Sequence, residues 1–337
     1  MMRNRHYRWL AAVVSLVVFT SAPARAEVDK VTIATQYGIG YLALTIMKHD
    51  KLIEKHLAEA GLRDTKVEWV KLAAGSAAND ALLSGTLNFA SGGTGPAFIL
   101  WDKTRDNFDV RGVAALSSMP NLLVTRDPNV KTIRDFTAKD KIAMAGAGSS
   151  VQTIYLEMAA AKAFGPENYA KLNTLMVKLP HPEGLAALLS GSSEITAQFT
   201  SPPFQYYALE KPGIHTVLNS YDVMGGPNTF LMVWATNKFR NANPASYKAV
   251  VAALKEATDS INANKRRAAE VYVQEGGNKD NIDKILKMME DPQVAYTMTP
   301  ERVLPYAQFM HKVGILRNQP ESWKDLFFPE IHSLPGS

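Results

Sequence analysis

The feature of this 337-residue sequence that most constrains its fold is a regular alternation of short β-branched segments with segments of helical periodicity. Residues 31–35 (VTIAT) predict a strand, and residues 42–53 predict a helix that follows it. Residues 67–70, 76–83 and 87–90 continue the order with a strand, a helix and a strand. Strands that alternate with helices form parallel βαβ units. The predicted fold class is therefore α/β, with mostly parallel sheets flanked by helices.

A second series of the same kind follows residue 121. It comprises predicted strands at residues 122–125, 141–145, 175–179 and 195–199, helices at residues 151–163 and 183–189, and a short helical turn at residues 132–136. A domain typically takes about 150 residues, so a chain of this length has room for two. Two series of strands therefore predict two lobes.

An internal repeat relates the two series. Residues 81–96 (ALLSGTLNFASGGTGP) align without a gap with residues 187–202 (ALLSGSSEITAQFTSP), and seven of the sixteen positions are identical. Chance similarity between two segments rich in Ala, Leu, Ser and Gly is the alternative. Both copies, however, follow a predicted strand and helix, and both end in Thr-x-Pro. The repeat predicts two similar lobes, each with a loop at the carboxyl ends of its strands.

The rest of the chain contains no strand series from which a third lobe could form. Residues 230–235 (FLMVWA) predict one more buried strand, and a helix is expected to begin at Asn243 and Pro244. The chain then crosses between the lobes twice, which makes a hinge and a cleft that opens and closes. We expect lobe one to comprise residues 27–118 and 228–337, and lobe two to comprise residues 119–227.

The first 26 residues have the pattern of a secretory signal peptide. Three arginines precede an apolar stretch at residues 9–19, and the small residues Ala24 and Ala26 follow it. The apolar stretch is shorter than the roughly 20 residues that span a membrane. We expect cleavage near Ala26 and export to the periplasm.

The charge balance and the absence of cysteine exclude several classes of protein. The chain has 37 Lys and Arg against 32 Asp and Glu, and four of the arginines lie in residues 1–26, so the remainder is nearly neutral at +1. It offers no basic stripe for nucleic acid. Without cysteine, a disulfide scaffold, a Cys-ligated metal centre and a lipidated N-terminal cysteine are all excluded. We expect a freely soluble exported protein with no nucleic-acid partner and no cofactor.

The loops after the predicted strands are the candidate ligand site. In open parallel sheets, ligands bind beyond the carboxyl ends of the strands, where loops lead into helix N-termini. Here these loops are rich in Gly, Ser, Thr, Gln and Tyr. Ser149 is expected to cap the helix at residues 151–163, and Gln152 to complete a capping box. Free N–H groups at such an N-terminus attract anions, although plain capping without a ligand is the alternative.

Nucleotide, metal and enzyme motifs have little support. Gly38-x-Gly40 lacks the third glycine of a dinucleotide fingerprint, and no phosphate-binding P-loop occurs. No HxH or HxxxH spacing indicates a histidine metal site. His181 and Glu183 could form an acid/base pair, but no nucleophile turn accompanies them. We therefore expect a binding protein with no catalytic residue and no metal.

Four segments together resemble a known family. They are residues 31–44 (VTIATQYGIGYLAL), 81–96, 131–150 (KTIRDFTAKDKIAMAGAGSS) and 179–191 (LPHPEGLAALLSG). This ordered set resembles the periplasmic solute-binding proteins of ABC importers, in the branch that serves nitrate, aliphatic sulfonates, taurine and thiamine precursors.

The resemblance implies a two-lobed periplasmic-binding-protein fold of type II. It also implies a monomer that clamps a small organic ligand and delivers it to an ABC permease and its ATPase in the inner membrane. The implied contacts are Tyr37, Tyr41, Gly75, Ser76, Gly93, Thr94, Ser149, Ser150, Thr200 and Ser201. Gln36, His181 and Asn228, which lie in the same loops and at the second crossing, complete the candidate set.

The ligand class and two other functions stay open. No Arg or Lys occurs in the candidate loops, so the ligand could be a sulfonate, a carboxylate or an aromatic molecule held by N–H groups and hydroxyls. An enzyme on the same two-lobed fold, using His181 or Glu183, is one alternative. A sensor whose closed form docks on a membrane receptor is the other.

Overall fold

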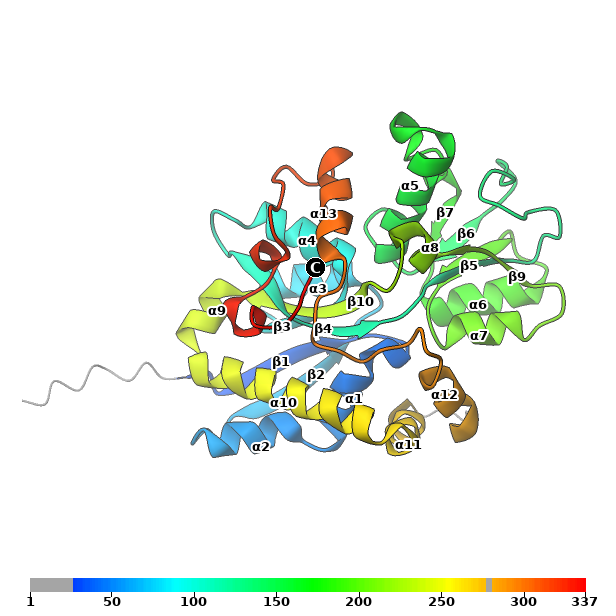
Figure 1. Ribbon diagram of the computed structural model, residues 1–337. Helices are drawn as coiled ribbons and strands as arrows, with labels where there is room; N and C mark the ends of the chain where they lie inside the picture. Colours follow the sequence, from blue (N-terminus) through cyan, green and yellow to red (C-terminus); the bar gives the residue numbers. More distant parts are fainter. Residues whose placement is uncertain (1–26, 277–280) are drawn as a thin grey trace, which may run out of the picture.

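The computed structural model describes residues 27–276 and 281–337, which form two α/β lobes side by side (Figure 1). The predicted signal peptide lies outside the described residues. Each lobe is built on a five-stranded sheet with helices on both faces. The predicted fold class is therefore confirmed. In the part of the chain that the structure describes, no helix is long and apolar enough to cross a membrane.

The first sheet has the strand order β2-β1-β3-β10-β4. Its strands are β1 (Lys30–Thr35), β2 (Lys66–Lys71), β3 (Phe89–Gly93), β4 (Val110–Ser118) and β10 (Thr229–Thr236). β1 pairs in parallel with β2 and β3, whereas β10 runs antiparallel between β3 and β4. β10 is buried along its whole length, as expected for a central strand covered on both faces.

The second sheet has the strand order β7-β6-β8-β5-β9. Its strands are β5 (Leu122–Thr125), β6 (Ile142–Met144), β7 (Met176–Lys178), β8 (Ala197–Thr200) and β9 (His215–Asn219). Here β5 is the antiparallel strand, between β8 and β9. The two sheets thus share one plan, and the internal repeat covers β3 and β8, which occupy the same central place in their sheets.

Helices cover the sheets on both sides. In lobe one these are α1 (Leu42–His49), α2 (Leu52–Glu59), α3 (Gly75–Leu83), α4 (Thr94–Lys103), α9 (Asn237–Ala242), α10 (Pro244–Ala263), α11 (Lys265–Gly276), α12 (Ile282–Met289) and α13 (Val303–Lys312). In lobe two they are α5 (Val151–Phe164), α6 (His181–Ser190), α7 (Phe204–Leu209) and α8 (Ser220–Met224). Figure 1 shows α4 and α13 on one side of the first sheet and α1, α2 and α10 on the other.

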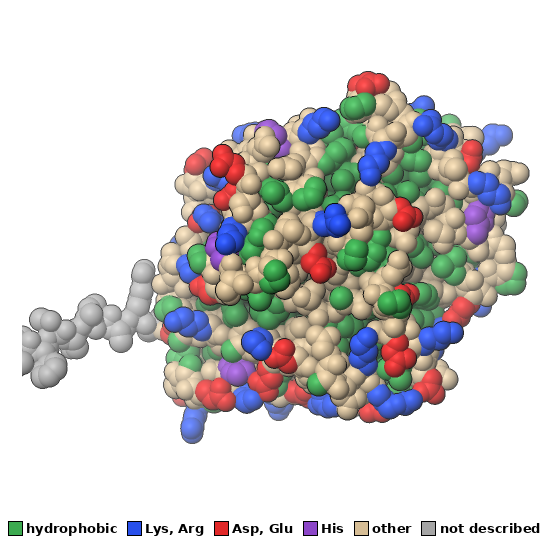
Figure 2. Space-filling model, viewed as in Figure 1, with side chains coloured by type: hydrophobic (Ala, Val, Ile, Leu, Met, Phe, Trp, Pro, Cys, Tyr) green, Lys and Arg blue, Asp and Glu red, His purple; other side chains and the backbone are tan. Residues whose placement is uncertain are grey.

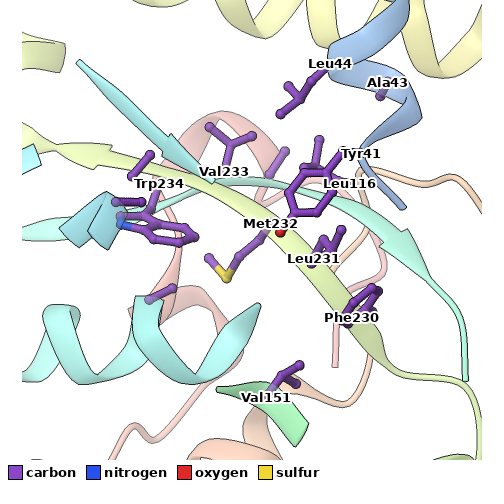
Figure 3. Packing of buried hydrophobic residues seen from close by; sticks show 14 of the residues in the cluster. Tyr41, Ala43, Leu44, Leu116, Val151, Phe230, Leu231, Met232, Val233 and Trp234 are labelled. Carbon is purple, nitrogen blue, oxygen red and sulfur yellow. The ribbon is translucent and has the colours of Figure 1, made fainter. Parts of the chain in front are cut away.

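The main core of lobe one lies along β10. Figure 3 shows Leu231, Val233 and Trp234 of this strand among apolar neighbours from β4 and the start of α1. Phe230 and Leu231 lie at the end of β10 that faces the second lobe, and Val151 of α5 lines the same cavity as they do. The core therefore reaches the edge where the two lobes meet.

Several elements differ from the sequence prediction. The single helix expected at residues 42–53 is two helices, because Lys51 adopts a left-handed backbone conformation (φ 52°) that ends the first. Residues 132–136 form turns rather than a helical turn. β4 and β9 were not predicted, since β9 is half-buried and has no strong apolar run. α13 begins at Val303, after Arg302 in the left-handed region.

The two crossings between the lobes are tied together by side chains. At the first crossing, the Ser118 hydroxyl donates to the backbone oxygen of Asn228 at 2.8 Å and lies 3.0 Å from the Tyr221 hydroxyl. At the second crossing, the Tyr155 hydroxyl of α5 donates to Asn228. Two linked crossings are the geometry of a hinge.

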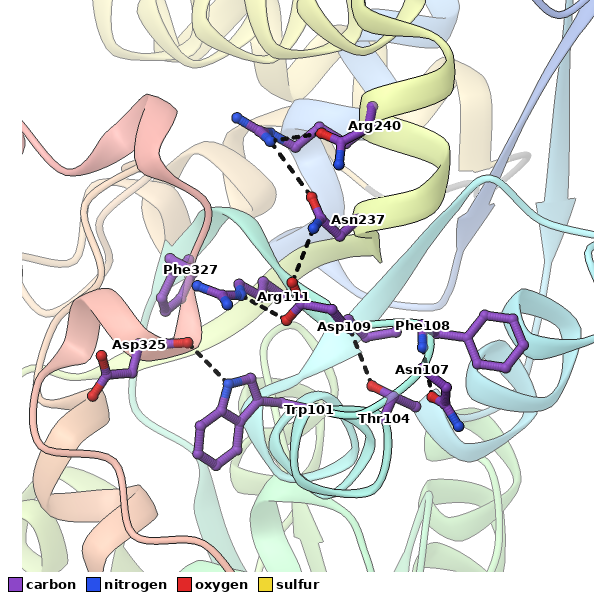
Figure 4. A network of polar contacts seen from close by, with 12 residues as sticks. Trp101, Thr104, Asn107, Phe108, Asp109, Arg111, Asn237, Arg240, Asp325 and Phe327 are labelled. Carbon is purple, nitrogen blue, oxygen red and sulfur yellow. Dashed lines mark hydrogen bonds and ion pairs between the residues drawn. The ribbon is translucent and has the colours of Figure 1, made fainter.

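A polar network far from the cleft holds the C-terminal segment onto lobe one (Figure 4). The Asp109 carboxylate accepts from Arg111 at 2.9 Å and from Asn237 at 3.0 Å. The Trp101 indole donates to the backbone oxygen of Asp325 at 2.9 Å. The Trp101 bond joins α4 to the C-terminal residues, and the Asp109 bonds join the start of β4 to α9.

Candidate functional site

A small cavity of about 40 Å³ lies between the lobes, at the carboxyl ends of the strands. From lobe one it is lined by Gln36, Tyr37, Tyr41, Ala73, Ala74, Gly75, Ser76, Gly93, Pro96, Phe230 and Leu231. From lobe two it is lined by Ala145, Gly146, Ser149, Ser150, Val151, Gln152 and His181. We call it the cleft cavity. It has room for a few atoms only, since one water molecule needs about 10–15 Å³ measured in this way.

Four helices begin at or beside the cleft cavity. α3 begins at Gly75 and α4 at Thr94 in lobe one, and α5 begins at Val151 and α6 at His181 in lobe two. None of the described side chains caps α3, α4 or α6. The first N–H groups of a helix lack intrahelical partners and carry partial positive charge. The cavity is therefore suited to a polar or negatively charged group, although no Lys or Arg lines it.

The expected cap of α5 was wrong by one residue. Ser150, not Ser149, is the N-cap, and its hydroxyl accepts from the backbone N–H of Thr153 at 3.2 Å. Gln152 does not complete a capping box, because its amide donates to the side chain of Asn121 at 2.8 Å. This leaves Ser149 in the cavity wall with its side chain half-buried.

His181 is a buried titratable side chain in the wall of the cleft cavity. Its Nδ1 lies 3.0 Å from the Thr200 hydroxyl, and its ring stacks on Phe204 with 5.6 Å between ring centres. Burial lowers the pKa of His181 to about 4. The imidazole is therefore neutral near pH 7 and offers the cavity a hydrogen-bonding group rather than a charge.

Gln36 is held rigidly at the boundary of the cavity. Its side-chain nitrogen donates to the backbone oxygen of Ser91 at 2.7 Å. Gly92 lies against it, and a Cβ at this position would be 2.9 Å from the same nitrogen. The polar end of Gln36 is thus fixed by β3, which makes it a positioned group at the wall of the cavity.

The lobes touch directly around the cavity. A Cβ on Gly93 would lie 2.9 Å from Cβ of Val151, and a Cβ on Gly38 would lie 3.0 Å from the backbone oxygen of Pro202. The backbone N–H of Ile39 donates to that same oxygen at 3.3 Å. Contacts this close leave no room for side chains, which explains the glycines at both positions.

Nine of the thirteen predicted site residues line the cleft cavity. They are Gln36, Tyr37, Tyr41, Gly75, Ser76, Gly93, Ser149, Ser150 and His181. The other four lie behind it. Thr94 is buried in the first turn of α4, Thr200 supports His181, Ser201 is buried after β8, and Asn228 belongs to the hinge.

A second, larger cavity of about 450 Å³ adjoins the first and was not predicted. It is lined by Thr35, Gln36, Tyr37, Gly38, Leu44, Thr45, Lys48, Trp69, Lys71, Pro182, Phe204, Tyr272, Glu275 and Gly276. We call it the outer cavity. The sequence places no Arg or Lys in the candidate loops, whereas Lys48 and Lys71 line the outer cavity. Lys71 is the last residue of β2, so its place at a strand end was the signal available in the sequence.

Of the acid/base pair that the sequence offers, only His181 lines the cleft cavity. Within residues 27–276 and 281–337, no group of three His, Asp or Glu residues could hold a metal ion. Glu183 is exposed and is not among the residues of either cavity wall. Basic and acidic side chains are interspersed over the face shown in Figure 2, with no basic stripe across it.

Comparison with known protein families places most of the chain in one family model. Residues 24–273 match the model of the NMT1-like family. The comparison with curated proteins finds no match.

Solved structures show the same fold at low sequence identity. The alkanesulfonate-binding protein SsuA of Xanthomonas axonopodis pv. citri, bound to MOPS, has a TM-score of 0.68 and 17% identity, over 87% of this chain and 96% of that one. The periplasmic aliphatic sulphonate binding protein SsuA of Escherichia coli has a TM-score of 0.64 and 17% identity, over 90% and 92% of the two chains. The periplasmic nitrate-binding protein NrtA of Synechocystis PCC 6803 has a TM-score of 0.66 and 15% identity, over 89% and 84%. The resemblance to periplasmic binding proteins of the nitrate and sulfonate branch is confirmed.

Proposed function

Because this chain belongs to the NMT1-like family, we propose that it is the solute-binding component of an ABC import system. It clamps a small organic ligand of the sulfonate, carboxylate or aromatic type between its lobes. The closed form then delivers the ligand to a membrane permease driven by its ATPase. The lobes of this proposal are residues 27–118 with 228–337, and residues 119–227.

The observation that carries the proposal is the cleft cavity itself. Helix N-termini from both lobes meet there, and its polar lining includes side chains from both lobes. A ligand group held by both lobes favours the closed form, because only closure brings the two sets of contacts together.

The cellular setting is part of the same proposal. The structural neighbours named above are binding proteins rather than enzymes, and two of them are called periplasmic. Together with the signal-peptide pattern of residues 1–26, this supports export to the periplasm, where we propose that the chain acts as a monomer.

A thermal-shift screen tests the proposal. The exported chain is mixed with alkanesulfonates, nitrate, aliphatic carboxylates and aromatic acids, and its melting temperature is measured. A ligand at 100 times its dissociation constant stabilises the folded state by about 2.7 kcal/mol, so a true ligand raises the melting temperature by several degrees. If no small solute raises it, the proposal is overturned.

A pair of variants in α3 tests whether the ligand occupies the cleft cavity. Ser76 lines the cavity, whereas Ser84 follows the same helix and is exposed. Ser76→Trp fills the cavity and is expected to weaken binding of any ligand found in the screen at least tenfold. Ser84→Trp is the matched control and is expected to bind as the wild type does. Equal affinities in the two variants would place the ligand elsewhere.

A further inference from the structure

The outer cavity is a site of mixed character that touches both lobes. Four aromatic rings line it, from Tyr37, Trp69, Phe204 and Tyr272, and Phe204 belongs to lobe two. At about 450 Å³ it has the size of a pocket for a small organic molecule. The cleft cavity is about a tenth of that volume, so it can hold no more than one small group of a ligand.

The charges that line the outer cavity are Lys48, Lys71 and Glu275. Lys48 is paired with Glu275 at 3.0 Å. Among residues 27–276 and 281–337, no carboxylate forms an ion pair with Lys71, whose ammonium instead lies 4.0 Å from the centre of the Tyr37 ring. Partial burial and the nearby charge of Lys48 lower the pKa of Lys71. The outer cavity thus holds an excess positive charge that an anion would stabilise.

The two cavities are continuous in their walls. Gln36 and Tyr37 line both. The ring of Phe204 in the outer cavity stacks on His181 of the cleft cavity, with the planes 23° apart. A single molecule of modest length can therefore reach from the helix N-termini, past Tyr37, to Lys71.

We propose that the ligand is a ring-bearing organic dianion that fills both cavities. One acidic group lies at the helix N-termini of the cleft cavity, the ring lies among the aromatic side chains of the outer cavity, and the second acidic group pairs with Lys71. This inference rests on the proposed solute-binding function and names the substrate class for it.

Calorimetry with three simple acids tests the inference on the exported chain. Terephthalate carries two carboxylates on opposite sides of a benzene ring, benzoate carries one, and trans-cyclohexane-1,4-dicarboxylate has two but no aromatic ring. We expect terephthalate to bind about tenfold more tightly than benzoate, because a hydrogen bond between charged groups is the stronger kind. We expect the cyclohexane compound to bind several-fold more weakly than terephthalate, because it cannot stack on the rings.

Variants at the two ends of β2 separate the effect of Lys71 from general electrostatics. Lys71→Gln is expected to lower terephthalate affinity about tenfold and to leave benzoate affinity unchanged. Lys71→Arg keeps the charge and is expected to stay within about threefold of the wild type. Lys66→Gln, at the exposed first residue of the same strand, is the matched control and is expected to change neither affinity.

The outcomes distinguish this inference from the proposed function. The proposal that the ligand is a dianion would be overturned by equal wild-type affinities for terephthalate and benzoate. It would also be overturned if Lys71→Gln lowered the affinity for both acids by the same factor. Failure of all three acids to bind, with another solute active in the thermal-shift screen, would also overturn it and leave the solute-binding function standing. Failure of every solute in that screen would overturn the function itself.

Discussion

At the scale of single residues, His181 decides how the cleft cavity handles charge. The imidazole is packed between the Thr200 hydroxyl and the Phe204 ring, and burial keeps it neutral near pH 7. An anionic group in the cavity would therefore be balanced by helix N-termini and not by a histidine cation. His181 contributes shape and a hydrogen bond, and any positive charge that ligand recognition needs comes from outside the cavity, at Lys71.

The buried imidazole also predicts how stability depends on pH. The pKa of His181 falls from 6.5 in the unfolded chain to about 4 in the folded one, so between these values the unfolded state binds more protons. The free energy of unfolding is expected to decrease as pH falls from about 6.5 to 4, by about 3 kcal/mol from this residue. Urea denaturation at several pH values between 4 and 6.5 measures this decrease in the free energy of unfolding.

Two variants isolate this contribution. His181→Asn keeps a partner for Thr200 and removes the titration, so its free energy of unfolding should fall less than that of the wild type over the same pH range. Thr200→Val keeps the buried imidazole and should keep the wild-type slope. If His181→Asn and the wild type show the same slope, the imidazole is not buried as the structure shows it.

At the scale of elements, the start of α10 shows why a local pattern can misplace a contact. Asn243 is the N-cap residue and Pro244 the first helical residue, as the sequence predicts, but the Asn243 side chain accepts from the backbone N–H of Val28 and does not cap the helix. Glu27 takes the capping role, and its carboxylate accepts from Ala245 at 2.8 Å and from Ser246 at 3.0 Å. The cap comes from the other end of the sequence, where no local pattern could reveal it.

This cap gives a prediction for stability. Glu27→Ala removes both bonds and the favourable charge at the helix N-terminus, and is expected to lower the free energy of unfolding by about 1 kcal/mol. Glu27→Gln keeps an oxygen acceptor without the charge and should lose less. Urea denaturation of the exported chain measures both. Ligand affinity should not change, because no residue of α10 lines either cavity. If Glu27→Ala were as stable as the wild type, the capping role of Glu27 would be refuted.

The elements of the site divide into those that sequence could predict and those that it could not. The alternation of strands and helices predicted both sheets and the loops at their carboxyl ends, so nine of the eighteen residues that line the cleft cavity were found, Gly75 and Ser149 among them. The outer cavity was missed because Trp69 and Lys71 face it from a strand, and α11 meets Phe204 there only after the two lobes have packed. Periodicity reports which face of an element is apolar, not which distant element will lie opposite.

At the scale of the whole molecule, the two lobes are built on the same plan. In each sheet one strand runs antiparallel to the other four: β10 in the first sheet and β5 in the second. Each of these two strands begins just after a crossing between the lobes. The reversed strand therefore starts at the edge where the other strands end, which brings Phe230 and Leu231 of β10 into the wall of the cleft cavity. The crossings and the wall of the cleft cavity are consequently built from the same short stretch of chain, so the clamping that we propose would open and close the cavity directly.

Closure itself predicts the effect of one methyl group. In Gly93→Ala the new Cβ would lie 2.9 Å from Cβ of Val151 across the cleft, and its three nearest neighbours all belong to that residue of lobe two. Overpacking of this kind costs about 1–3 kcal/mol, and it acts on the closed form alone. Ligand affinity is expected to fall about tenfold or more, while the stability of the unliganded chain changes little. Calorimetry measures the affinity, and small-angle scattering with saturating ligand should show a larger radius of gyration than in the wild type.

The compensating substitution decides whether the cause is closure. Val151→Gly removes the atoms that the new methyl group would meet, so the double variant should regain most of the wild-type affinity and the compact scattering profile, and Val151→Gly alone should bind nearly as the wild type does. If the new methyl group instead disturbed lobe one itself, Gly93→Ala would weaken binding equally in the wild-type background and in the Val151→Gly background. That result would mean that Gly93 serves the local packing of β3 and α4, and that the lobes do not meet at this point when ligand is bound.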